Sequence, residues 1–486
     1  MATKRNARKT FLQQFHGLVQ ELEGCEDVDL SGSLRLGTEK VRIPAPTLPL
    51  QIQLGSEPGY RLHLYPELCF DANAQLQPSG DYLLLDPEEY FSDISGFLRL
   101  YHGEALTLGR RDQLQRRLLR YPKLVEERHL RLKLSPKGLA LKRKSTRAPA
   151  CIAPLTARSA RERMARWRRR QLGQLHGLLR GPLEPLPGAE ALTLLEQVNA
   201  LLATEPYRVR TADDRPGGLL ALPERARPIF VGDLHARIDN LLVVLTQGGF
   251  LDALAEGSAV LILLGDAVQP DAPGREAEME DSVLMMELIF RLKVRFPDRV
   301  FYLRGNHDSF SDEISKAGIP QGLVWEQHLI TTRGQAYRDA MQRFYDLLPY
   351  VAVAPSYIAC HAGPPTGYCT WQMLVEIDRH PRLAHQLTHV RLRRNNSPKG
   401  YGASDLARLR RCLGVREQTP CIVGHTPLSR DETCWIDAGG IANHHVLYGA
   451  HPDWIGVITR GRKHLLPLRY PSEPLLAAYN HFSANA

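Results

Sequence analysis

Five short apolar runs in the second half of the chain each end in a small cluster of Gly, Asp, Asn or His. The runs cover residues 228–231, 260–264, 300–303, 357–359 and 421–423. Uninterrupted apolar segments of this length are typical of strands buried on both faces of a sheet. Between them lie stretches with helical spacing, such as residues 281–295 and 404–412. This alternation predicts an α/β domain, which we place at residues 226–472.

The first half of the chain has a different pattern. Residues 11–22 carry apolar side chains at helical spacing, and a Pro-rich passage follows at residues 43–54. Short strand-like pieces then predict a small β-rich domain at residues 60–155. We therefore divide the remainder into four parts. They are an N-terminal extension at 1–59, the β-rich domain at 60–155, a basic helical linker at 156–225 and a C-terminal tail at 473–486.

Length and charge support several domains in one globular protein. A chain of 486 residues exceeds a single ordinary core. Its formal net charge of +9 is concentrated in residues 137–147 and 158–180, which favours a solvated helix face over a nucleic-acid-binding stripe. The eight cysteines form no C-x-x-C pair, which indicates reduced thiols and a cytoplasmic protein. Neither a signal peptide nor an apolar run of about 18 residues is visible, so we expect no membrane association.

The polar clusters carry the chemistry. Parallel strands bring their carboxyl ends to one rim of a sheet, so residues after successive strands converge there. Asp and Asn oxygens and His nitrogens suit Mn, Fe or Zn, and two such ions about 3.5–4 Å apart can clamp a phosphoryl group and deprotonate a water. A single Gly-Asp or Gly-His after a strand is more often a turn or helix cap. Five in series favour a two-metal phosphoesterase site. The candidate ligands are Asp233, His235, Asp266, Asn306, His361 and His425.

At these residues the chain resembles the metal-dependent phosphoprotein phosphatase (PPP) superfamily of calcineurin-like metallophosphoesterases, in its bacterial form. Residues 282–308 are similar to the family's helix and strand that lead into a Gly-Asn-His-Asp or Gly-Asn-His-Glu motif. Residues 344–349 and 358–363 resemble its Leu-Pro, strand and His-Gly-Gly passage, and residues 436–440 its Asp-Gly turn. The resemblance covers about half of the chain. It implies a four-layer α/β/β/α sandwich.

The resemblance also implies a role for each residue. Asp233 and His235 would bind a first metal, Asp266 would bridge two metals, and Asn306, His361 and His425 would bind the second. The cofactors would be two divalent ions, Mn, Fe or Zn, with Mn expected first. A hydroxide bridging the metals would attack phosphorus, and His307 would protonate the leaving group as general acid.

The second motif departs from the family pattern. Where the family has Gly-Asp-x-Val-Asp-Arg-Gly, residues 265–271 have Gly-Asp-Ala-Val-Gln-Pro-Asp. Gln269 replaces the aspartate that orients the catalytic histidine, so Gln269, Asp271 or Asp308 must accept a hydrogen bond from His307. Pro270 replaces a phosphate-binding arginine. The candidate replacements are Arg275, Arg304, Lys399 and the pair Arg393 and Arg394.

Part of the β-rich region resembles a degenerate forkhead-associated (FHA) domain, a phosphothreonine-reading β-sandwich. Arg110 and His129 match the family's Gly-Arg and Ser-x-x-His positions, but Glu126 takes the place of the phosphate-binding serine. A carboxylate at that place repels phosphate. Lys142, Arg143 and Lys144 could offset the charge, but a structural β-domain packed on the catalytic one is the favoured interpretation. A protein partner that binds through this domain is a further expectation.

The leading hypothesis is a phosphatase for phosphate monoesters, with phosphoserine or phosphothreonine in proteins as substrate. Three alternatives remain. The chain could hydrolyse dinucleoside polyphosphates or other small phosphoesters, or it could be a scaffold in which the altered second motif has disabled turnover. Alternatively, the basic helices could bring the site to nucleic acid and make it a nuclease-like phosphodiesterase.

Overall fold

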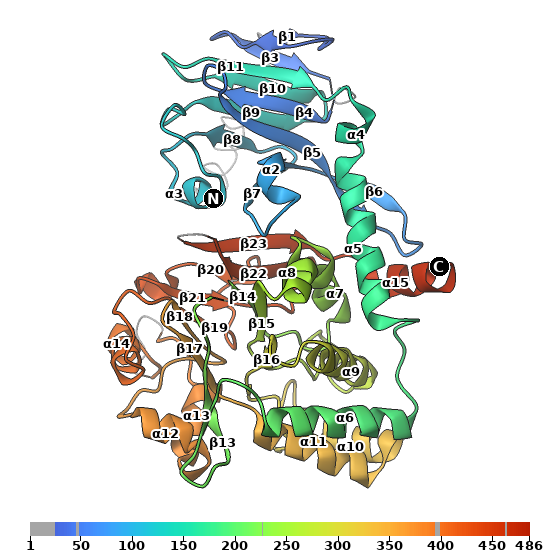
Figure 1. The fold of residues 1–486 in the computed structure, drawn as a ribbon, viewed down its shortest axis with the longest axis vertical. Helices are drawn as coiled ribbons and strands as arrows, with labels where there is room; N and C mark the ends of the chain where they lie inside the picture. The colour runs from blue at the N-terminus through green and yellow to red at the C-terminus, as the bar shows by residue number, and fades with distance from the viewer. Residues whose placement is uncertain (1–24, 45–47, 226, 394–398, 462–463) are drawn as a thin grey trace, which may run out of the picture. The chain divides into compact units, whose positions relative to one another are not determined.

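The computed structural model describes residues 25–44, 48–225, 227–393, 399–461 and 464–486. The amphipathic segment predicted at residues 11–22 lies outside these residues. The chain divides into two compact units. One comprises residues 1–69 and 77–167, and the other residues 70–76 and 168–486. The predicted combination of a β-rich N-terminal region with an α/β C-terminal half is confirmed (Figure 1).

The N-terminal unit contains two sheets. The first has the order β1 (Glu26–Asp27), β3 (Lys40–Ile43), β10 (Gly138–Arg143), β9 (Leu130–Ser135), β8 (Ala105–Leu108). The second has the order β2 (Leu34–Arg35), β11 (Ala150–Pro154), β4 (Leu50–Leu54), β5 (Tyr60–Phe70), β6 (Leu76–Leu85), β7 (Phe97–Leu100). Apolar side chains alternate along β4 and β9 and meet in one core, which includes Ile52, Leu132 and Leu141. Two short helices, α2 (Pro87–Tyr90) and α3 (Gln113–Leu118), join the strands.

Strands β1 to β4 place the start of this unit well before residue 60, where the sequence predicts it. The residues from 26 to 54 pair with strands from the other end of the unit: β3 with β10, and β4 with β11. Such pairing depends on contacts about 100 residues apart along the chain, so no local pattern announces it.

The C-terminal unit is built on two further sheets. The larger has the order β12 (Arg208–Arg210), β13 (Pro216–Ala221), β17 (Val351–Ala354), β18 (Tyr357–Cys360), β19 (Cys421–Val423), β21 (His444–Leu447), β20 (Cys434–Trp435). The smaller has the order β16 (Val300–Tyr302), β15 (Ala259–Leu263), β14 (Arg227–Val231), β22 (Trp454–Arg460), β23 (Leu465–Pro471). Buried residues from both sheets, among them Phe230, Ile262 and Ile422, form one shared core. The five predicted apolar runs correspond to β14, β15, β16, β18 and β19.

Helices cover the outer faces of this pair of sheets. Helices α12 (Trp371–Val375), α13 (Pro381–His389) and α14 (Ala403–Cys412) supply apolar side chains to the core on the outer side of the larger sheet. Helices α7 (Ile238–Thr246), α8 (Phe250–Glu256) and α9 (Glu280–Arg295) contact strands of the smaller sheet. Helix α6 (Gly188–Ala203) packs on α9, α11 (Gln335–Leu347) packs on α6, and α10 (Gln321–Arg333) packs on α11. Two 3₁₀ turns, η2 (Ile377–Arg379) and η3 (Ala438–Gly440), complete the loops.

The segment predicted as a basic linker is only partly a linker. It contains α4 (Arg158–Arg161) and α5 (Arg163–Leu179), but also α6, β12 and β13, and β13 pairs with β17 inside the larger sheet. The sequence pattern does not indicate this strand, because it contains Gly217 and Gly218, and glycine is uncommon inside strands. Both glycines are needed here, since a side chain at either position would collide with neighbouring backbone. The predicted tail forms α15 (Leu475–Ala484), which packs on α7.

Most basic residues of α5 face solvent, as expected for a solvated face, but Arg168 is buried. Its guanidinium lies 2.7 Å from both carboxylate oxygens of Glu473, which also accepts a hydrogen bond from the Gln247 amide. Burial raises the pKa of Glu473, and the adjacent guanidinium opposes that rise. The pair therefore holds α5 to the loop that precedes α15.

Candidate metal centre

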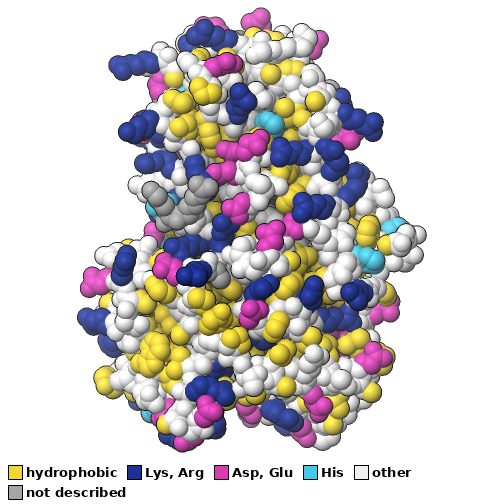
Figure 2. All heavy atoms as spheres, viewed as in Figure 1, with side chains coloured by type: hydrophobic (Ala, Val, Ile, Leu, Met, Phe, Trp, Pro, Cys, Tyr) yellow, Lys and Arg dark blue, Asp and Glu magenta, His cyan; other side chains and the backbone are white. Residues whose placement is uncertain are grey.

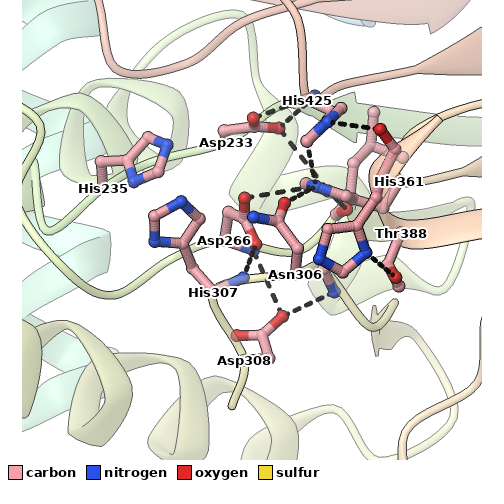
Figure 3. Close-up of polar contacts among 12 residues, drawn as sticks. Asp233, His235, Asp266, Asn306, His307, Asp308, His361, Thr388 and His425 are labelled. Atoms are coloured by element: carbon pink, nitrogen blue, oxygen red, sulfur yellow. Dashed lines mark hydrogen bonds and ion pairs between the residues drawn. The ribbon is translucent and has the colours of Figure 1, made fainter. Parts of the chain in front are cut away.

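The loops that follow five of the strands meet at one place (Figure 3). Asp233 and His235 follow β14, Asp266 follows β15, Asn306 and His307 follow β16, and single histidines follow β18 and β19. The loops are joined through their backbones, because the amides of Leu234 and His235 both donate to the carbonyl of Asp266. His235, Asp266 and His425 have φ values of 42°, 52° and 65°, in the left-handed region that non-glycine residues rarely occupy. Strained backbone of this kind persists where surrounding contacts enforce it, and it concentrates at functional sites.

Two glycines allow the close approach of these loops. A side chain at Gly305 would collide with the carboxylate of Asp266, and a side chain at Gly424 would collide with that of Asp233. The Gly in each Gly-Asn-His and Gly-His motif is therefore needed to bring the next polar residue into the cluster.

Four polar atoms from four different loops converge on one point. The Nε2 atom of His361 lies 3.2 Å from Asp266 Oδ2, 3.0 Å from Asn306 Oδ1 and 3.2 Å from His425 Nδ1. Ligand atoms around an ion bound at about 2.0–2.1 Å are separated by roughly 3.0–3.4 Å, so these spacings match the edges of a coordination shell. His361 is completely buried, which excludes an ordinary hydrated surface cluster.

The histidines are oriented as metal ligands are. His361 Nδ1 lies 2.8 Å from the carbonyl of Leu264, His425 Nε2 lies 3.2 Å from the carbonyl of His389, and His235 Nδ1 lies 3.0 Å from the carbonyl of Gln269. Because a carbonyl only accepts, each of these ring nitrogens carries the hydrogen, and the opposite nitrogen of a neutral ring presents its lone pair to the cluster. Metal-binding histidines are held in this way. Two such lone pairs, on His361 and His425, face each other at 3.2 Å, which requires a cation between or upon them.

Two buried carboxylates add to the demand for positive charge. Asp233 and Asp266 are each 1% exposed. Burial, and then the charge of Asp266, raise the pKa of Asp233 to about 6 against the opposing effect of His361. The two aspartates raise the pKa of His361 to about 9 against the effect of its burial. A proton on His361 or a divalent ion would answer the same deficit.

The residues present therefore fit a dinuclear site. His361, Asp266 and His425 form one group able to hold an ion, and His235, Asp266 and His307 form a second that shares Asp266. Asp233 stands beside both, its carboxylate accepting hydrogen bonds of 3.0 and 2.9 Å from the His425 amide. The structure thus brings together all six predicted ligands, and metal binding by each remains a prediction.

Gln269 is the residue that orients His307. The side-chain Oε1 of Gln269 lies 2.6 Å from Nδ1 of His307, and its Nε2 donates to the His307 carbonyl at 3.2 Å. The imidazole of His307 is thus held by a neutral amide. In the PPP superfamily, which the sequence resembles, a carboxylate usually takes this place. Burial lowers the pKa of His307 to about 3, opposed by the charge of Asp266. An amide cannot balance an imidazolium charge as a carboxylate does.

The other two predicted acceptors serve different contacts. Asp308 is completely buried and accepts hydrogen bonds from the Tyr302 hydroxyl at 2.7 Å and the Gly305 amide at 2.7 Å. These contacts shape the loop that carries Asn306, and among the described residues the His307 ring is hydrogen-bonded to Gln269 and not to Asp308; a catalytic role for Asp308 stays a prediction. Asp271 accepts a hydrogen bond from the Tyr448 hydroxyl and lies 3.7 Å from the Lys316 ammonium.

A cavity of about 350 Å³ opens over the cluster. His235, Asp266, Asn306, His307 and His425 line one part of its wall. Lys316, Arg391 and Tyr448 line another, and all three escaped the sequence analysis. Lys316 lies in a loop without a recognisable motif. Arg391 stands in the same basic run as the residues considered, so only its position in space separates it from them.

Of the proposed phosphate-binding residues that the structure describes, none lines this cavity. Arg304 donates to the carbonyl of Tyr345 at 2.5 Å and lies 3.7 Å from Asp346, so it is directed toward the end of α11. Arg275 pairs with Glu278 at 2.5 Å and with Asp281 at 3.2 Å, on the wall of a neighbouring cavity. Lys399 is exposed, and Arg394 lies outside the described residues.

In the N-terminal unit, Glu126 fills the place where the FHA resemblance would put a phosphate. Its carboxylate accepts hydrogen bonds from the backbone amides of Thr146, Arg147 and Ala148 at 3.2, 2.9 and 2.8 Å. These contacts lower its pKa. His129 is buried. Its Nδ1 accepts a hydrogen bond from the Glu126 amide, and its Nε2 donates to the carbonyl of Pro149. Arg110 donates to the carbonyl of Val125.

Two further expectations concern surfaces. On the face of the molecule in Figure 2, Lys and Arg side chains are interspersed with acidic and apolar ones. Among the described residues no single helix has the length and hydropathy to cross a membrane, and one pair bent by 68°, α7 with α8, passes that test on length and composition alone. Both helices contribute mostly buried residues to the C-terminal unit.

Comparison with known families identifies the domain that carries the site. Residues 226–454 match the model of the calcineurin-like phosphoesterase family. The C-terminal half thus contains a calcineurin-like phosphoesterase domain, a hydrolase family for which divalent metals are implied. The match includes all six candidate ligands.

Among curated proteins, the similarity is distant. The chain is 26% identical over 159 residues to the PP2A-like serine/threonine-protein phosphatase PPG1 of Candida albicans, covering 32% of this chain and 33% of that protein. It is 34% identical over 88 residues to a serine/threonine-protein phosphatase 7 long form homolog of Arabidopsis thaliana, covering 18% of this chain and 6% of that one. The chain therefore spans a third or less of these relatives.

Solved structures also align with the chain. A protein serine/threonine phosphatase of Saccharomyces cerevisiae with similarity to human phosphatase PP5 aligns with 17% identity and a TM-score of 0.43, over 59% of this chain and 90% of that one. A cold-active protein-tyrosine phosphatase of a psychrophilic Shewanella aligns with 11% identity and a TM-score of 0.33, over 52% and 82%.

Proposed function

We propose that this protein is a phosphatase that depends on two divalent metal ions and hydrolyses phosphate monoesters, with phosphoserine or phosphothreonine in proteins as its substrate class. The observation that carries the proposal is the orientation of three histidines. Each gives its outer N–H to a backbone carbonyl and turns a lone pair toward two buried aspartates. The distant phosphatase relatives favour a phosphoprotein substrate.

Asp233, His235 and Asp266 would hold one ion, and Asp266, Asn306, His361 and His425 the other. Bound there, the ions would act as Lewis acids toward the phosphoryl oxygens and lower the pKa of a coordinated water. The remaining steps belong to the protein. Lys316 and Arg391 border the cavity and would neutralise the outer phosphate oxygens, in place of the arginine lost at Pro270. His307, fixed through its Nδ1–H by Gln269, would first take up a proton at Nε2 from water in the cavity, against its lowered pKa, and would then deliver that proton to the leaving oxygen.

The proposal is tested by turnover of p-nitrophenyl phosphate with the protein loaded with Mn²⁺, Fe²⁺ or Zn²⁺. Asp266→Asn should abolish turnover, whereas Asp378→Asn, which changes an exposed aspartate paired with Arg215, should not alter it. If no divalent ion supports turnover, the protein is a scaffold. Substrate class is then ranked with a phosphothreonine peptide, a dinucleoside tetraphosphate and bis-p-nitrophenyl phosphate. A strong preference for the diester would overturn the assignment to monoesters.

We also propose that the N-terminal sandwich is a structural module and not a reader of phosphothreonine. Glu126 already occupies the three backbone donors at residues 146–148 with its own negative charge. A phosphate could enter only by displacing it. Full-length Glu126→Ser should therefore bind a phosphothreonine peptide more tightly than the unchanged chain in a calorimetric titration. Tight phosphopeptide binding by the unchanged chain that survives loss of the metal centre would contradict this assignment.

A further inference from the structure

A second cavity of about 350 Å³ adjoins the metal centre. His235 and Asp271 line both cavities, so together they form part of the wall between them. The second cavity extends from this wall to the first turn of α7 and to the start of α15, where Pro474 and Leu476 lie. A volume of this size accommodates a substantial part of a small ligand or a peptide side chain. A molecule bound at the metals could thus extend past His235 into this space.

The charged groups of the second cavity differ in how well they are satisfied. Asp239 accepts a hydrogen bond of 2.7 Å from the Leu476 amide, and Glu473 is paired with Arg168. Asp271 is held by Tyr448, and Arg275 is held by Asp281 and Glu278. Each carboxylate named here, and the Arg275 guanidinium, therefore already has a partner.

Within the part of the chain that the structure describes, Arg237 is held less tightly, by an ion pair with Asp271 and without a hydrogen bond at its Nε atom. Its Nε atom is buried and has no hydrogen-bond partner among the described residues. The carboxylate oxygen of Asp271 lies 3.9 Å away, which is too far for a hydrogen bond. The rest of the side chain is accessible, at 29% exposed overall, and Arg237 lines the cavity. An anionic group in the cavity would give the exposed part of this guanidinium a charged acceptor.

The geometry points to a second anion subsite. We infer that the cavity beside His235 binds an anionic group carried by the same substrate as the phosphate at the metals, and that Arg237 is the residue that holds it. The inference rests on the proposed function and narrows its substrate class to phosphate monoesters with a second negative group nearby. In a phosphoprotein this group would be an acidic side chain close to the phosphorylated residue.

The test compares inhibitors that need one subsite or two. Inorganic phosphate fits the metal centre alone, whereas a non-hydrolysable bisphosphonate with a short carbon spacer carries a second anion. Both are titrated as competitors of p-nitrophenyl phosphate in the metal-loaded full chain. The ratio of the two inhibition constants is then measured in the unchanged protein, Arg237→Gln and Arg275→Gln. Arg275→Gln is the matched control, because it removes a guanidinium from the same cavity that already has two acidic partners.

The unchanged protein and Arg275→Gln should bind the bisphosphonate at least about tenfold more tightly than phosphate, and Arg237→Gln should lose this preference, as expected for one charge-assisted hydrogen bond. Equal weakening of both inhibitors by Arg237→Gln would mean that Arg237 grips the phosphate at the metals, and would overturn the inference. So would an unchanged ratio in Arg237→Gln.

Substrates provide the second arm. Two phosphothreonine peptides that differ only by Glu or Gln next to the phosphorylated residue should differ in kcat/KM in the unchanged protein but not in Arg237→Gln. If neither peptide is hydrolysed while the preference for the bisphosphonate persists, the proposal of a phosphoprotein substrate is wrong, but the second anion subsite is supported. A small phosphoester would then supply the second anionic group. If the protein turns over nothing, titration calorimetry with the same two inhibitors decides on the subsite alone.

Discussion

Replacing Gln269 by Glu changes the partner of His307 without changing its length. The hydrogen bond between Gln269 Oε1 and His307 Nδ1 is 2.6 Å long and completely buried on the Gln269 side. A glutamate at this position would keep the acceptor and add a negative charge beside the ring. It would lose the second contact, the 3.2 Å hydrogen bond from Nε2 to the His307 carbonyl. Gln269→Leu would lose both contacts.

The size of the effect follows from the two kinds of hydrogen bond. A neutral bond contributes about 0.5–1.5 kcal/mol and a charged one about 1.5–3 kcal/mol, so the protonated ring gains roughly 1 kcal/mol in Gln269→Glu. That gain corresponds to about a fivefold rate increase where protonation of the leaving group limits the reaction. Loss of the bond to the carbonyl lowers the free energy of unfolding by about 1 kcal/mol. Gln269→Leu should slow the same substrates by about tenfold or more, since the ring is no longer held.

The assay is the ratio of kcat for phenyl phosphate to kcat for p-nitrophenyl phosphate. Phenoxide is the more basic leaving group and needs the proton, whereas p-nitrophenoxide leaves well without it. The ratio should rise in Gln269→Glu and fall in Gln269→Leu, and His307→Ala should lower it further. A ratio that moves in the same direction in both Gln269 variants, or in neither, would refute the assignment of His307 as an acid positioned by Gln269.

Four further outcomes are expected. Asp266→Asn should lower kcat by more than about 100-fold, because even the partners of metal ligands cost 10–100-fold, and chelation of the metals should lower the melting temperature of the unchanged protein but not of the variant. Lys316→Ala and Arg391→Ala should each raise KM for p-nitrophenyl phosphate by about tenfold, and a change confined to kcat would contradict their role as phosphate donors. Arg168→Ala should destabilise the C-terminal unit by about 3–5 kcal/mol in urea unfolding, because Glu473 is left buried without its ion-pair partner. The double variant Arg168→Met, Glu473→Gln should lose less. An equal loss of stability in the double variant would contradict the explanation by an uncompensated charge. Burial lowers the pKa of His63 to about 4. Below about pH 6.5 this histidine is therefore protonated in the unfolded chain but still neutral in the folded one. The melting temperature of the full chain should fall as the pH drops from about 6.5 toward 4, and this dependence on pH should be weaker in His63→Gln.

The pattern of buried strands and polar loop residues was enough to predict the α/β half and the six residues that cluster in it. The reason is local: β15 is apolar at every position, and the polar residue that ends it can only lie at the rim of its sheet. The acceptor for His307 was narrowed to three residues by the need for a partner on Nδ1, and the structure selects Gln269 among them. The sequence did not predict the boundaries of the β-rich unit and of the linker as well, because β4 and β13 pair with strands about 100 or more residues away along the chain.

The residues that surround the phosphate were beyond the reach of the sequence. Arg304 sits directly before the Gly-Asn-His motif and still turns away toward α11, whereas Lys316 and Arg391 reach the cavity from loops with no motif. The direction of a long side chain depends on which carbonyls and carboxylates lie around it, and those come from distant segments. The absence of a hydrogen-bond partner for Arg237 Nε among the described residues likewise depends on which distant segments pack around it. The sequence alone predicted the buried strands and the set of candidate ligands, since both depend on residue type and spacing. Only the tertiary structure decided which cations face the cavity and which are already paired, because pairing depends on the packing of loops that are far apart in the chain.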